Sequence, residues 1–413
     1  MRIFTCTPFP FGGGEDFFAR DSGLMCRGLQ ACGHESMAVM PGDRQPEDRP
    51  DLLRTEYANL ESVAWWKTQQ LDGVVLYAWG HPTYRNVARA IREAGITLIL
   101  NQDNGGWISP LGSFQGWLHE LWIILGGKTS VRTLLSFCKA AVKGVTYGLC
   151  VTDPLRATHL KQGHIIACVS PTAAKRYQLL CKSYGGDAMV RRVRMLPHPV
   201  EPRFQIQAQA TKSRMIACVG RWQDLIQKRP ALMQAVLEQV LTRDAQVRVE
   251  IAGELTEALS AWHQSLPATA KQRVRLRGRL GRDELVDLFQ AAQVFYSPSA
   301  YESFGIAAGE ALCTGCSVVA GPSPSMAAFE WFTSENFGTL AQRDQLEEHV
   351  AALIEELAHW DQGRRNAQEI SKTWCERLHA PKVAARATEM ILESRQSQAD
   401  IHPQPHPSSP MSA

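Results

Sequence analysis

The sequence predicts two consecutive α/β domains, each built on a parallel sheet, that face each other across a cleft. The first observation is length, because 413 residues exceed what one typical core supports. The second is rhythm: in both halves short apolar runs alternate with helical patterns, which is typical of doubly wound parallel sheets. Ligands of such folds bind where parallel strands end, so we expect the functional site in the cleft.

The first domain is expected over residues 1–200. An apolar strand at its start runs into a glycine cluster, and a helical pattern over 15–31 then ends at Gly33, a favourable C-cap. Further helices are expected over 83–95 and 172–186. Apolar runs predict the remaining strands at 35–41, 73–80, 96–103, 164–170 and 190–197.

The second domain is expected over residues 201–375, after a polar, proline-containing linker. It repeats the alternation, with helices over 229–243 and 281–292. A C-terminal helix over 376–395 is expected to return to the first domain, and the Pro- and Ser-rich tail 396–413 to be disordered. The apolar runs that predict strands here are 215–221, 246–254, 273–280, 293–299 and 317–322.

Composition argues against several partners. Apolar residues make up 45% of the chain and charged residues 21%, and a net charge of +3 gives no argument for nucleic acid. The 11 cysteines have no repeated spacing and are expected to be reduced thiols in a cytoplasmic compartment. Cys313 and Cys316 form a C-x-x-C, which alone is a weak metal or redox signal. We expect neither a cleaved signal nor a run of the ~18–20 apolar residues that a membrane span requires.

One apolar segment of the second domain, residues 296–322, holds two carboxylates eight positions apart, Glu302 and Glu310. Carboxylates are seldom placed among apolar residues unless something pairs with them. A helix beginning near Gly305 would point free N–H groups into the cleft, which suits a phosphate. Along one helix the carboxylates would lie about 12 Å apart, which suits the ends of an extended ligand better than one metal ion. The alternative is structural, with Ser299 and Glu302 as a capping box and Glu310 in an ion pair.

Two cations follow the first strand of the second domain. Arg221 comes directly after the strand, and Lys228 lies seven residues further on. Because the carboxyl ends of parallel strands face the same cleft, these side chains could clamp a leaving diphosphate. Solvation at the surface, the usual state of Lys and Arg, is the alternative.

The first domain offers candidate loops for the opposite wall of the cleft. Three glycines at 12–14 separate a strand from a helix, where they permit close approach of a ligand or simply form a turn. Two later strand ends carry His81 and Gln102-Asp103. A His or Asp there could position or deprotonate an attacking hydroxyl, although turn formation explains such residues equally well.

Taken together, these segments resemble the family-4 retaining glycosyltransferases of the GT-B fold, in which two Rossmann-like domains face each other across a cleft. The resemblance runs over most of the chain and is strongest in the second domain. "GGGE" is similar to the family's GG-x-E opening loop, "CVGRWQDLIQK" to its G-R…K donor motif, and "RMLPHPVEPRF" to the P-n-G-v-D element that closes the first domain. "YSPSAYESFGIAAGEALCTGCSVVA" resembles the E-x7-E region almost throughout.

The resemblance implies transfer of a hexosyl group from a UDP- or GDP-sugar to a glycan or lipid-linked acceptor with retention of configuration, in cell-surface polysaccharide or glycolipid synthesis. Arg221 and Lys228 would neutralise the diphosphate. Glu302 would contact the transferred sugar and Glu310 the ribose hydroxyls. No metal and no cofactor besides the donor is implied, since no D-x-D motif stands where a metal-dependent enzyme would need one. The other donor-binding residues would be Gly13, Gly14, Gly220, Ser303, Phe304, Gly305 and Ile306.

Three departures limit what carries over. The family's His-Asp at a strand end reads Gln102-Asp103, so Asp103, or His81 from the neighbouring strand, would have to assist the acceptor hydroxyl. "GPSPSMAAF" replaces the family's GG-x-x-E, which puts donor contacts there in doubt. "PHPVE" replaces P-n-G-v-D, a change expected to affect the hinge rather than the chemistry.

Two other functions are compatible with this fold. One is a phosphorylase or an epimerase of a nucleotide sugar, and the other is a catalytically silent partner protein. A silent copy would not need Arg221, Lys228, Glu302 and Glu310 together, so their joint presence favours an enzyme.

Residues 111–163 are the part least similar to the family. Their basic side chains outnumber Glu120 and Asp153 and are interleaved with large apolar residues. One interpretation is a basic amphipathic surface that rests on an anionic membrane, at its cytoplasmic face, and meets a lipid-linked acceptor. The other is a helical insertion that packs its apolar face on its own domain. The basic residues are Lys128, Arg132, Lys139, Lys143, Arg156 and Lys161.

Overall fold

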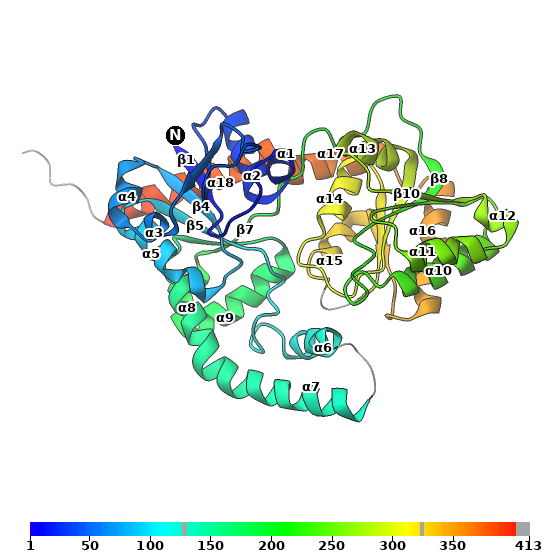
Figure 1. Ribbon diagram of the computed structural model, residues 1–413, viewed down its shortest axis with the longest axis horizontal. Coiled ribbons are helices and arrows are strands. Elements are labelled where there is room, and N and C mark those ends of the chain that lie inside the picture. Colours follow the sequence, from blue (N-terminus) through cyan, green and yellow to red (C-terminus); the bar gives the residue numbers. More distant parts are fainter. Residues whose placement is uncertain (126–129, 323–325, 402–413) are drawn as a thin grey trace, which may run out of the picture.

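The computed structural model describes residues 1–125, 130–322 and 326–401, with side chains described as far as residue 397. It confirms the predicted fold class, because two α/β domains lie side by side, each with helices around a parallel sheet (Figure 1). A helical arm projects from the first domain, below both sheets in this view. The Lys128 position and the middle of the "GPSPSMAAF" loop lie outside the described residues.

The first sheet has seven parallel strands in the order β3-β2-β1-β4-β5-β6-β7. The central strand β1 is fully buried and pairs with β4 through Thr5 and Val75. The sequence does not predict the edge strand β3, since it is only four residues long and mostly half-buried. The strands span Ile3–Cys6 (β1), Ala38–Pro41 (β2), Leu52–Thr55 (β3), Gly73–Tyr77 (β4), Thr97–Gln102 (β5), Ile165–Cys168 (β6) and Val193–Met195 (β7).

The helices of the first domain follow the predicted alternation with one break. The pattern over 15–31 is two helices, because the chain is extended at Arg20 (φ −156°) and left-handed at Asp21 (φ 49°). Gly23 permits this tight turn, since a Cβ there would collide with the Phe17 carbonyl. The helices span Glu15–Phe18 (α1), Asp21–Ala31 (α2), Tyr57–Leu60 (α3), Val63–Thr68 (α4), Arg85–Glu93 (α5), Asp153–Leu160 (α8) and Pro171–Val190 (α9).

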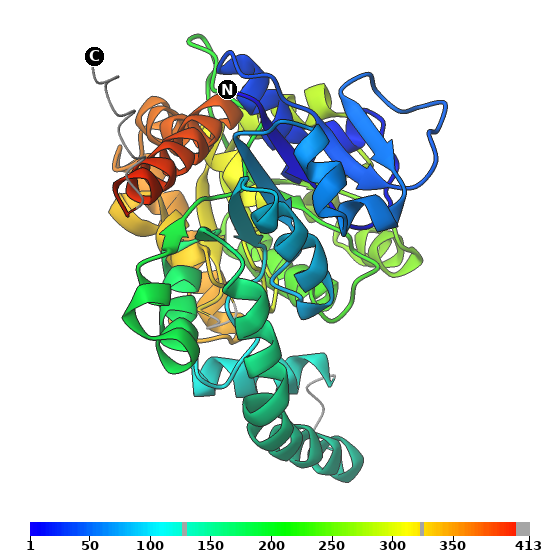
Figure 2. The same cartoon turned by 90° about the vertical axis from the view of Figure 1, so that its left-hand side faces the viewer.

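The helical region predicted over 111–163 forms the arm and its root. Helices α6 (Phe114–Ile124) and α7 (Val131–Lys143) make up the arm, and α7 continues through a π-helical segment, Gly144–Thr152, into α8. Only α8 joins the core of the first domain, where Leu160 is fully buried. Figures 1 and 2 show α7 running away from both sheets. The interpretation that the whole insertion packs on its own domain is therefore wrong for α7, none of whose residues is buried.

The second sheet has six parallel strands in the order β10-β9-β8-β11-β12-β13. Its strands span Ser213–Val219 (β8), Arg248–Ala252 (β9), Val274–Gly278 (β10), Ala292–Ser297 (β11), Ser317–Ala320 (β12) and Gly338–Leu340 (β13). The helices around it span Pro230–Arg243 (α10), Glu257–Ser265 (α11), Ala268–Lys271 (α12), Arg282–Ala291 (α13), Ile306–Cys313 (α14), Phe329–Phe332 (α15), Leu346–Asp361 (α16) and Ala367–Leu378 (α17).

The last helix, α18 (Ala380–Ile401), crosses back to the first domain. Val383, Ala387 and Ile391 are fully buried there in the same cluster as Ile3. The helix lies close to α2, since a Cβ on Gly28 would stand 2.5 Å from the Ala380 carbonyl oxygen. Residues 396–401, expected in the disordered tail, continue this helix, and the rest of the tail lies outside the described residues.

Candidate active site

The carboxyl ends of the two sheets face each other across an interdomain cavity of about 510 Å³. The second domain contributes the residues that follow β8 and β11 and the first turn of α14. The first domain contributes residues that follow β5 and the break between α1 and α2. Most of the residues predicted from the sequence therefore meet here: Gly220, Arg221, Lys228, Glu302, Ser303, Phe304, Gly305, Ile306 and Asp103.

The start of α14 has the geometry expected of an anion site. Gly305 precedes the helix with φ 84°, and a Cβ there would lie 2.8 Å from the Phe329 ring, so the position requires glycine. The helix begins only at Ile306, after Glu302, so the capping-box alternative is wrong. Ser299 Oγ instead donates to the Glu302 carboxylate, at 3.0 Å. The Ala308 amide donates to the Gly305 carbonyl oxygen at 2.9 Å, so the amides of Ile306 and Ala307 are the ones that a ligand in the cavity can use.

The two cations of the second domain are held differently. Lys228 Nζ pairs with Glu302, and both side chains are largely buried. Arg221 is 68% exposed; its guanidinium donates to Gln227 Oε1 at 3.0 Å and lies 3.8 Å from Asp224. Surface solvation alone does not describe Lys228, whose ammonium group is fixed beside the start of α14. Because the Arg221 side chain is largely exposed, it has room to reorient toward a bound ligand.

Glu310 lies deeper than the predicted ribose contact requires. Its side chain is buried, and its carboxylate accepts a hydrogen bond from Arg282 Nη2 at 2.7 Å. Burial raises the pKa of Glu310, although Arg282 opposes this shift. Arg282 also lies 3.4 Å from Glu201, so the guanidinium is shared between two carboxylates. Glu310 does not line the cavity, and any contact with ribose has to compete with Arg282.

A buried histidine forms the first-domain wall together with two carboxylates. His198 Nε2 lies 2.8 Å from Asp103 Oδ1, and His198 Nδ1 lies 3.4 Å from Asp21 Oδ1. Burial alone would lower the pKa of His198, but Asp103 and Asp21 raise it to about 9. Burial would likewise raise the pKa of Asp103, yet His198 and the Ser303 hydroxyl hold it below its ordinary value. Protonated His198 thus stands between two carboxylates at the edge of the cavity.

"PHPVE" was expected to affect the hinge rather than the chemistry, and the structure places its histidine, His198, at the edge of the cavity. The departure from the family's motif was the signal that marked it, but nothing in its spacing pointed to Asp103, which lies far away along the chain. Arg20 and Asp21 are also missed by the sequence, because a continuous helix was expected over them. The contact forms only when segments from three parts of the chain meet.

A second, smaller cavity of about 220 Å³ opens beside the first, within the first domain. Five aromatic side chains line it, and the rings of two of them, Phe9 and Trp79, stack at 4.1 Å. Arg20, Asp21 and Asp103 line both cavities, so the two spaces meet at the carboxylates. The five aromatic residues are Phe9, Phe11, Phe17, Tyr77 and Trp79.

Besides Glu310, three of the predicted residues are not brought to these cavities. His81 caps a short 3₁₀ turn, where its Nδ1 accepts from the Thr83 amide at 3.3 Å, so the turn-forming interpretation describes it. Gly13 faces away from the cleft, since a Cβ there would collide with Asp48. Gly14 is likewise placed beside Glu47. In this structure Gly13 and Gly14 therefore allow close packing of the opening loop and do not face a ligand cavity.

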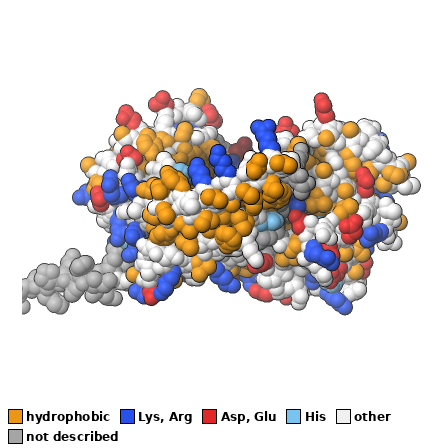
Figure 3. Space-filling view, turned by 90° about the horizontal axis from the view of Figure 1, so that it is seen from below, with side chains coloured by type: hydrophobic (Ala, Val, Ile, Leu, Met, Phe, Trp, Pro, Cys, Tyr) orange, Lys and Arg blue, Asp and Glu red, His pale blue; other side chains and the backbone are white. Residues whose placement is uncertain are grey.

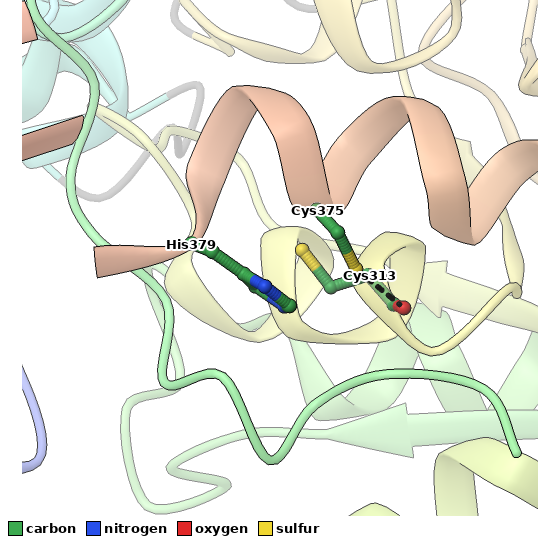
Figure 4. Close-up of side chains that lie close together, drawn as sticks. All are labelled: Cys313, Cys375 and His379. Atoms are coloured by element: carbon green, nitrogen blue, oxygen red, sulfur yellow. Dashed lines mark hydrogen bonds between the residues drawn. The ribbon is translucent and has the colours of Figure 1, made fainter. Parts of the chain in front are cut away.

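The C-x-x-C pair does not form one site. Figure 4 shows Cys313 beside Cys375 and His379 from the end of α17, and their ligand atoms lie within 4.8 Å of one another. Cys316 instead takes a hydrogen bond from Lys212 Nζ, at 3.5 Å. His379 Nε2 is already 3.0 Å from the Phe204 carbonyl oxygen, so the cluster is satisfied as a buried polar contact. All 11 cysteines lie in the described parts of the chain, and each is a free thiol.

Comparison with known proteins agrees with this geometry. Residues 213–359 match the model of the family described as glycosyl transferases group 1. No curated protein matches the sequence. Among solved structures, a glycosyltransferase from Rickettsia africae is similar over 96% of this chain and 99% of its own, at 12% identity and TM-score 0.63.

Two further solved structures share the fold over their whole length. The lipopolysaccharide outer core galactosyltransferase WaaB is 12% identical over 96% of this chain and 100% of its own, at TM-score 0.61. Anabaena Alr3699/HepE, in complex with UDP and glucose, is 13% identical over 95% and 100%, at TM-score 0.56. These findings confirm the resemblance: the chain has the GT-B fold, and its second domain carries the signature of the group 1 glycosyltransferases over residues 213–359.

Proposed function

We propose that the protein is a retaining hexosyltransferase that moves a sugar from a UDP- or GDP-sugar to a glycan or lipid-linked acceptor. Such a reaction serves the synthesis of cell-surface polysaccharide or glycolipid from the cytoplasmic side. One observation carries the proposal. Lys228, Glu302 and the start of α14 meet in one cavity with Asp103 and His198 of the opposite domain.

The second domain would bind the donor. Its diphosphate would lie at the start of α14, where free N–H groups and the helix dipole favour negative charge. Lys228 and Arg221 would add the two positive charges that a metal supplies in other transferases, so we propose that catalysis is metal-independent. HepE has been solved in complex with UDP, with UDP-glucose, and with UDP and glucose, which supports a uridine nucleotide as the first donor to test.

Departure of the nucleoside diphosphate leaves positive charge on the anomeric carbon and negative charge on the diphosphate. Lys228 is already oriented toward that charge by its pairing with Glu302, so little reorganisation is needed during the reaction. Glu302 would contact the transferred sugar from the same position. Retention follows if the acceptor hydroxyl attacks the face from which the leaving group departs.

The first domain would bind the acceptor. Phe9 and Trp79 offer a stacked aromatic surface that suits the apolar face of a sugar ring, and the cavity they line meets the donor cavity at Asp103. Asp103 is kept ionised by His198 and can accept the hydrogen bond of an acceptor hydroxyl. His198 acts through Asp103 and is a positioning residue. Closure of the two walls would exclude water that would otherwise hydrolyse the donor.

The test is a calorimetric and thermal-shift screen of nucleoside diphosphates and their sugars. We expect one uridine or guanosine diphosphate to stabilise the protein, by about 2.7 kcal/mol at a hundred times its dissociation constant. Glu310→Gln, which keeps a partner for Arg282, should weaken this binding if Glu310 reaches the ribose. Glu302→Gln should lower turnover by more than it lowers nucleotide binding, and the opposite pattern would reverse the two roles.

Product analysis separates the alternatives. Transfer to a glycan or lipid acceptor with an unchanged anomeric configuration supports the proposal. Formation of a sugar phosphate from inorganic phosphate identifies a phosphorylase, and change of the nucleotide sugar without an acceptor identifies an epimerase. Failure of every nucleotide to bind favours the silent partner.

A further inference from the structure

The arm leaves one apolar helix face without a covering element among the described residues. The helix from Val131 to Leu160 is continuous over 30 residues, and its most apolar 18-residue window has mean hydropathy 1.3 with none of it buried. By length and composition alone this helix is long and apolar enough to cross a membrane, although its apolar residues are interrupted by basic ones. A soluble protein seldom exposes so much contiguous apolar surface without a partner.

The exposed apolar side chains form a stripe along α7 and the π-helical segment. They recur at the three- and four-residue spacing of one helix face, and Leu135, with an exposed fraction of 66%, lies among them. Figure 3 shows the resulting apolar patch from below, with Lys and Arg side chains along one edge. The stripe consists of Val131 (76% exposed), Leu134 (54%), Leu135 (66%), Val142 (63%) and Val145 (38%).

The opposite face of α7 is already occupied by α6. The rings of Trp122 and Phe137 meet edge to face at 5.4 Å. A Cβ on Gly144 would collide with the Trp117 ring, so the two helices are in close contact there. The stripe is therefore not a surface left over from loose packing of the arm, but a second apolar face.

Charge identifies the kind of partner. Arg132, Lys139 and Lys143 lie four and seven positions apart, so they share one edge of the stripe, and all three are exposed. Within 114–125 and 130–152 the only carboxylate is Glu120, which is half-buried. Two copies of the chain that met on this face would bring like charges together, whereas anionic lipid headgroups supply the opposite charge.

We propose that the arm docks on an anionic lipid bilayer, with the stripe buried at the level of the upper acyl chains and the basic edge on the headgroup phosphates. The helix lies in the plane of the surface rather than across the membrane. Lys139 and Lys143 stand in the middle of the apolar stretch, where a crossing helix would bury them at high cost. Its far end is also fixed in the first domain, where Arg156 donates to the Ile108 carbonyl oxygen at 3.1 Å and Leu160 is fully buried.

The docked arm would bring the candidate active site to the membrane. Asn104, directly after Asp103, lines a cavity of about 260 Å³ together with Trp117, Leu121 and Ile124 of α6. This apolar space connects the arm with the first-domain wall of the site. It suits the hydrocarbon part of a lipid-linked acceptor, a consequence that rests on the proposed function, whereas the docking itself does not.

Flotation of the full chain with lipid vesicles tests the docking. Vesicles of phosphatidylglycerol and phosphatidylcholine are compared with vesicles of phosphatidylcholine alone, at low and high salt. Lys139→Gln/Lys143→Gln should weaken binding to the anionic vesicles about 25-fold at low salt, from about fivefold for each basic residue. Leu134→Gln/Leu135→Gln should weaken it at least tenfold at either salt concentration, because the apolar contribution is not screened.

The controls are matched for exposure and side-chain type. Leu179→Gln/Leu392→Gln alters two exposed leucines outside the arm (53% and 44% exposed), and Lys67→Gln/Lys372→Gln alters two exposed lysines. Both should bind as wild type does, and all variants should keep the thermal unfolding of wild type and its stabilisation by nucleotide.

Absence of vesicle binding, or equal loss of binding in variants and controls, overturns the docking. A dimer in solution that Leu134→Gln/Leu135→Gln dissolves, without vesicle binding, assigns the face to a second copy instead. Resistance of membrane-bound protein to an alkaline carbonate wash overturns the in-plane geometry.

Discussion

The two walls of the interdomain cavity come from similar sheets but differ in charge and shape. The second-domain wall presents Lys228, the exposed Arg221 and a helix start, all of which favour an anion. The first-domain wall presents Asp21 and Asp103 with one buried cation between them, and an aromatic cavity beside them. Parallel sheets do not impose this difference, because the loops after the strands carry all of it. A cation-rich wall suits a leaving diphosphate, and an aromatic wall with carboxylates suits a neutral hydroxylic acceptor.

The largest effect is expected when a positive charge is removed from the donor wall. Lys228→Met removes the largely buried cation of the cavity and should lower kcat/KM for the donor by about 10²–10³, with little change in the KM of the acceptor. Steady-state kinetics with both substrates varied measure this difference. Lys271→Met, at a partly exposed position of the same domain that lines neither cavity, should leave both constants unchanged. If the KM of the acceptor rose while the donor kinetics stayed unchanged, the wall that contains Lys228 would bind the acceptor and not the donor.

The contrast between the walls also explains which parts of the site the sequence predicts. Arg221, Lys228, Glu302 and Gly305 are predictable, since each follows a strand or begins a helix within one continuous segment and keeps the family's spacing. Asp21 and His198 are not, because their role depends on a helix break and on an interdomain connection that reach the same place only in three dimensions.

The fold shows the same limit. The central strands are predicted because they are buried on both faces and their sequences are apolar runs. The short edge strands β3 and β13 are mostly half-buried and have no such run, so they are not predicted. The docking arm is predicted as a helical region with basic and apolar residues, but sequence periodicity cannot show whether an apolar face meets its own domain. The exposed stripe on α7 settles that question.

The second expected effect concerns the buried cation of the first-domain wall. His198 has a folded pKa of about 9 against an ordinary value of 6.5. Its pairing with Asp103 and Asp21 therefore stabilises the fold fully below pH 6.5, and this contribution is lost as the pH rises through about 9. The shift corresponds to about 3 kcal/mol. Tyr77 also packs near the imidazole, but its own pKa lies well above this range.

His198→Asn, which introduces the residue of the family's motif, measures this contribution. The free energy of unfolding of the variant should fall below that of wild type at pH 6, and the two should converge above pH about 9. A turnover that declines over the same interval in wild type, but not in the variant, would show that His198 positions Asp103 as well as stabilising it. A constant difference in stability across this range would contradict the charged pair.

The smallest expected effect tests the aromatic side of the comparison. Trp79→Ala removes one ring of the Phe9–Trp79 stack and should raise the KM of a glycan acceptor by up to about tenfold, which is the range of one aromatic contact. Tyr57→Ala is a matched control, because Tyr57 and Trp79 are both 39% exposed while Tyr57 lies outside the cavity. The donor KM should not change in either variant. If Trp79→Ala raised the KM of donor and acceptor alike, the aromatic cavity would also bind the donor. The assignment of the donor to one wall and the acceptor to the other would then be wrong at Asp103, where the two cavities meet.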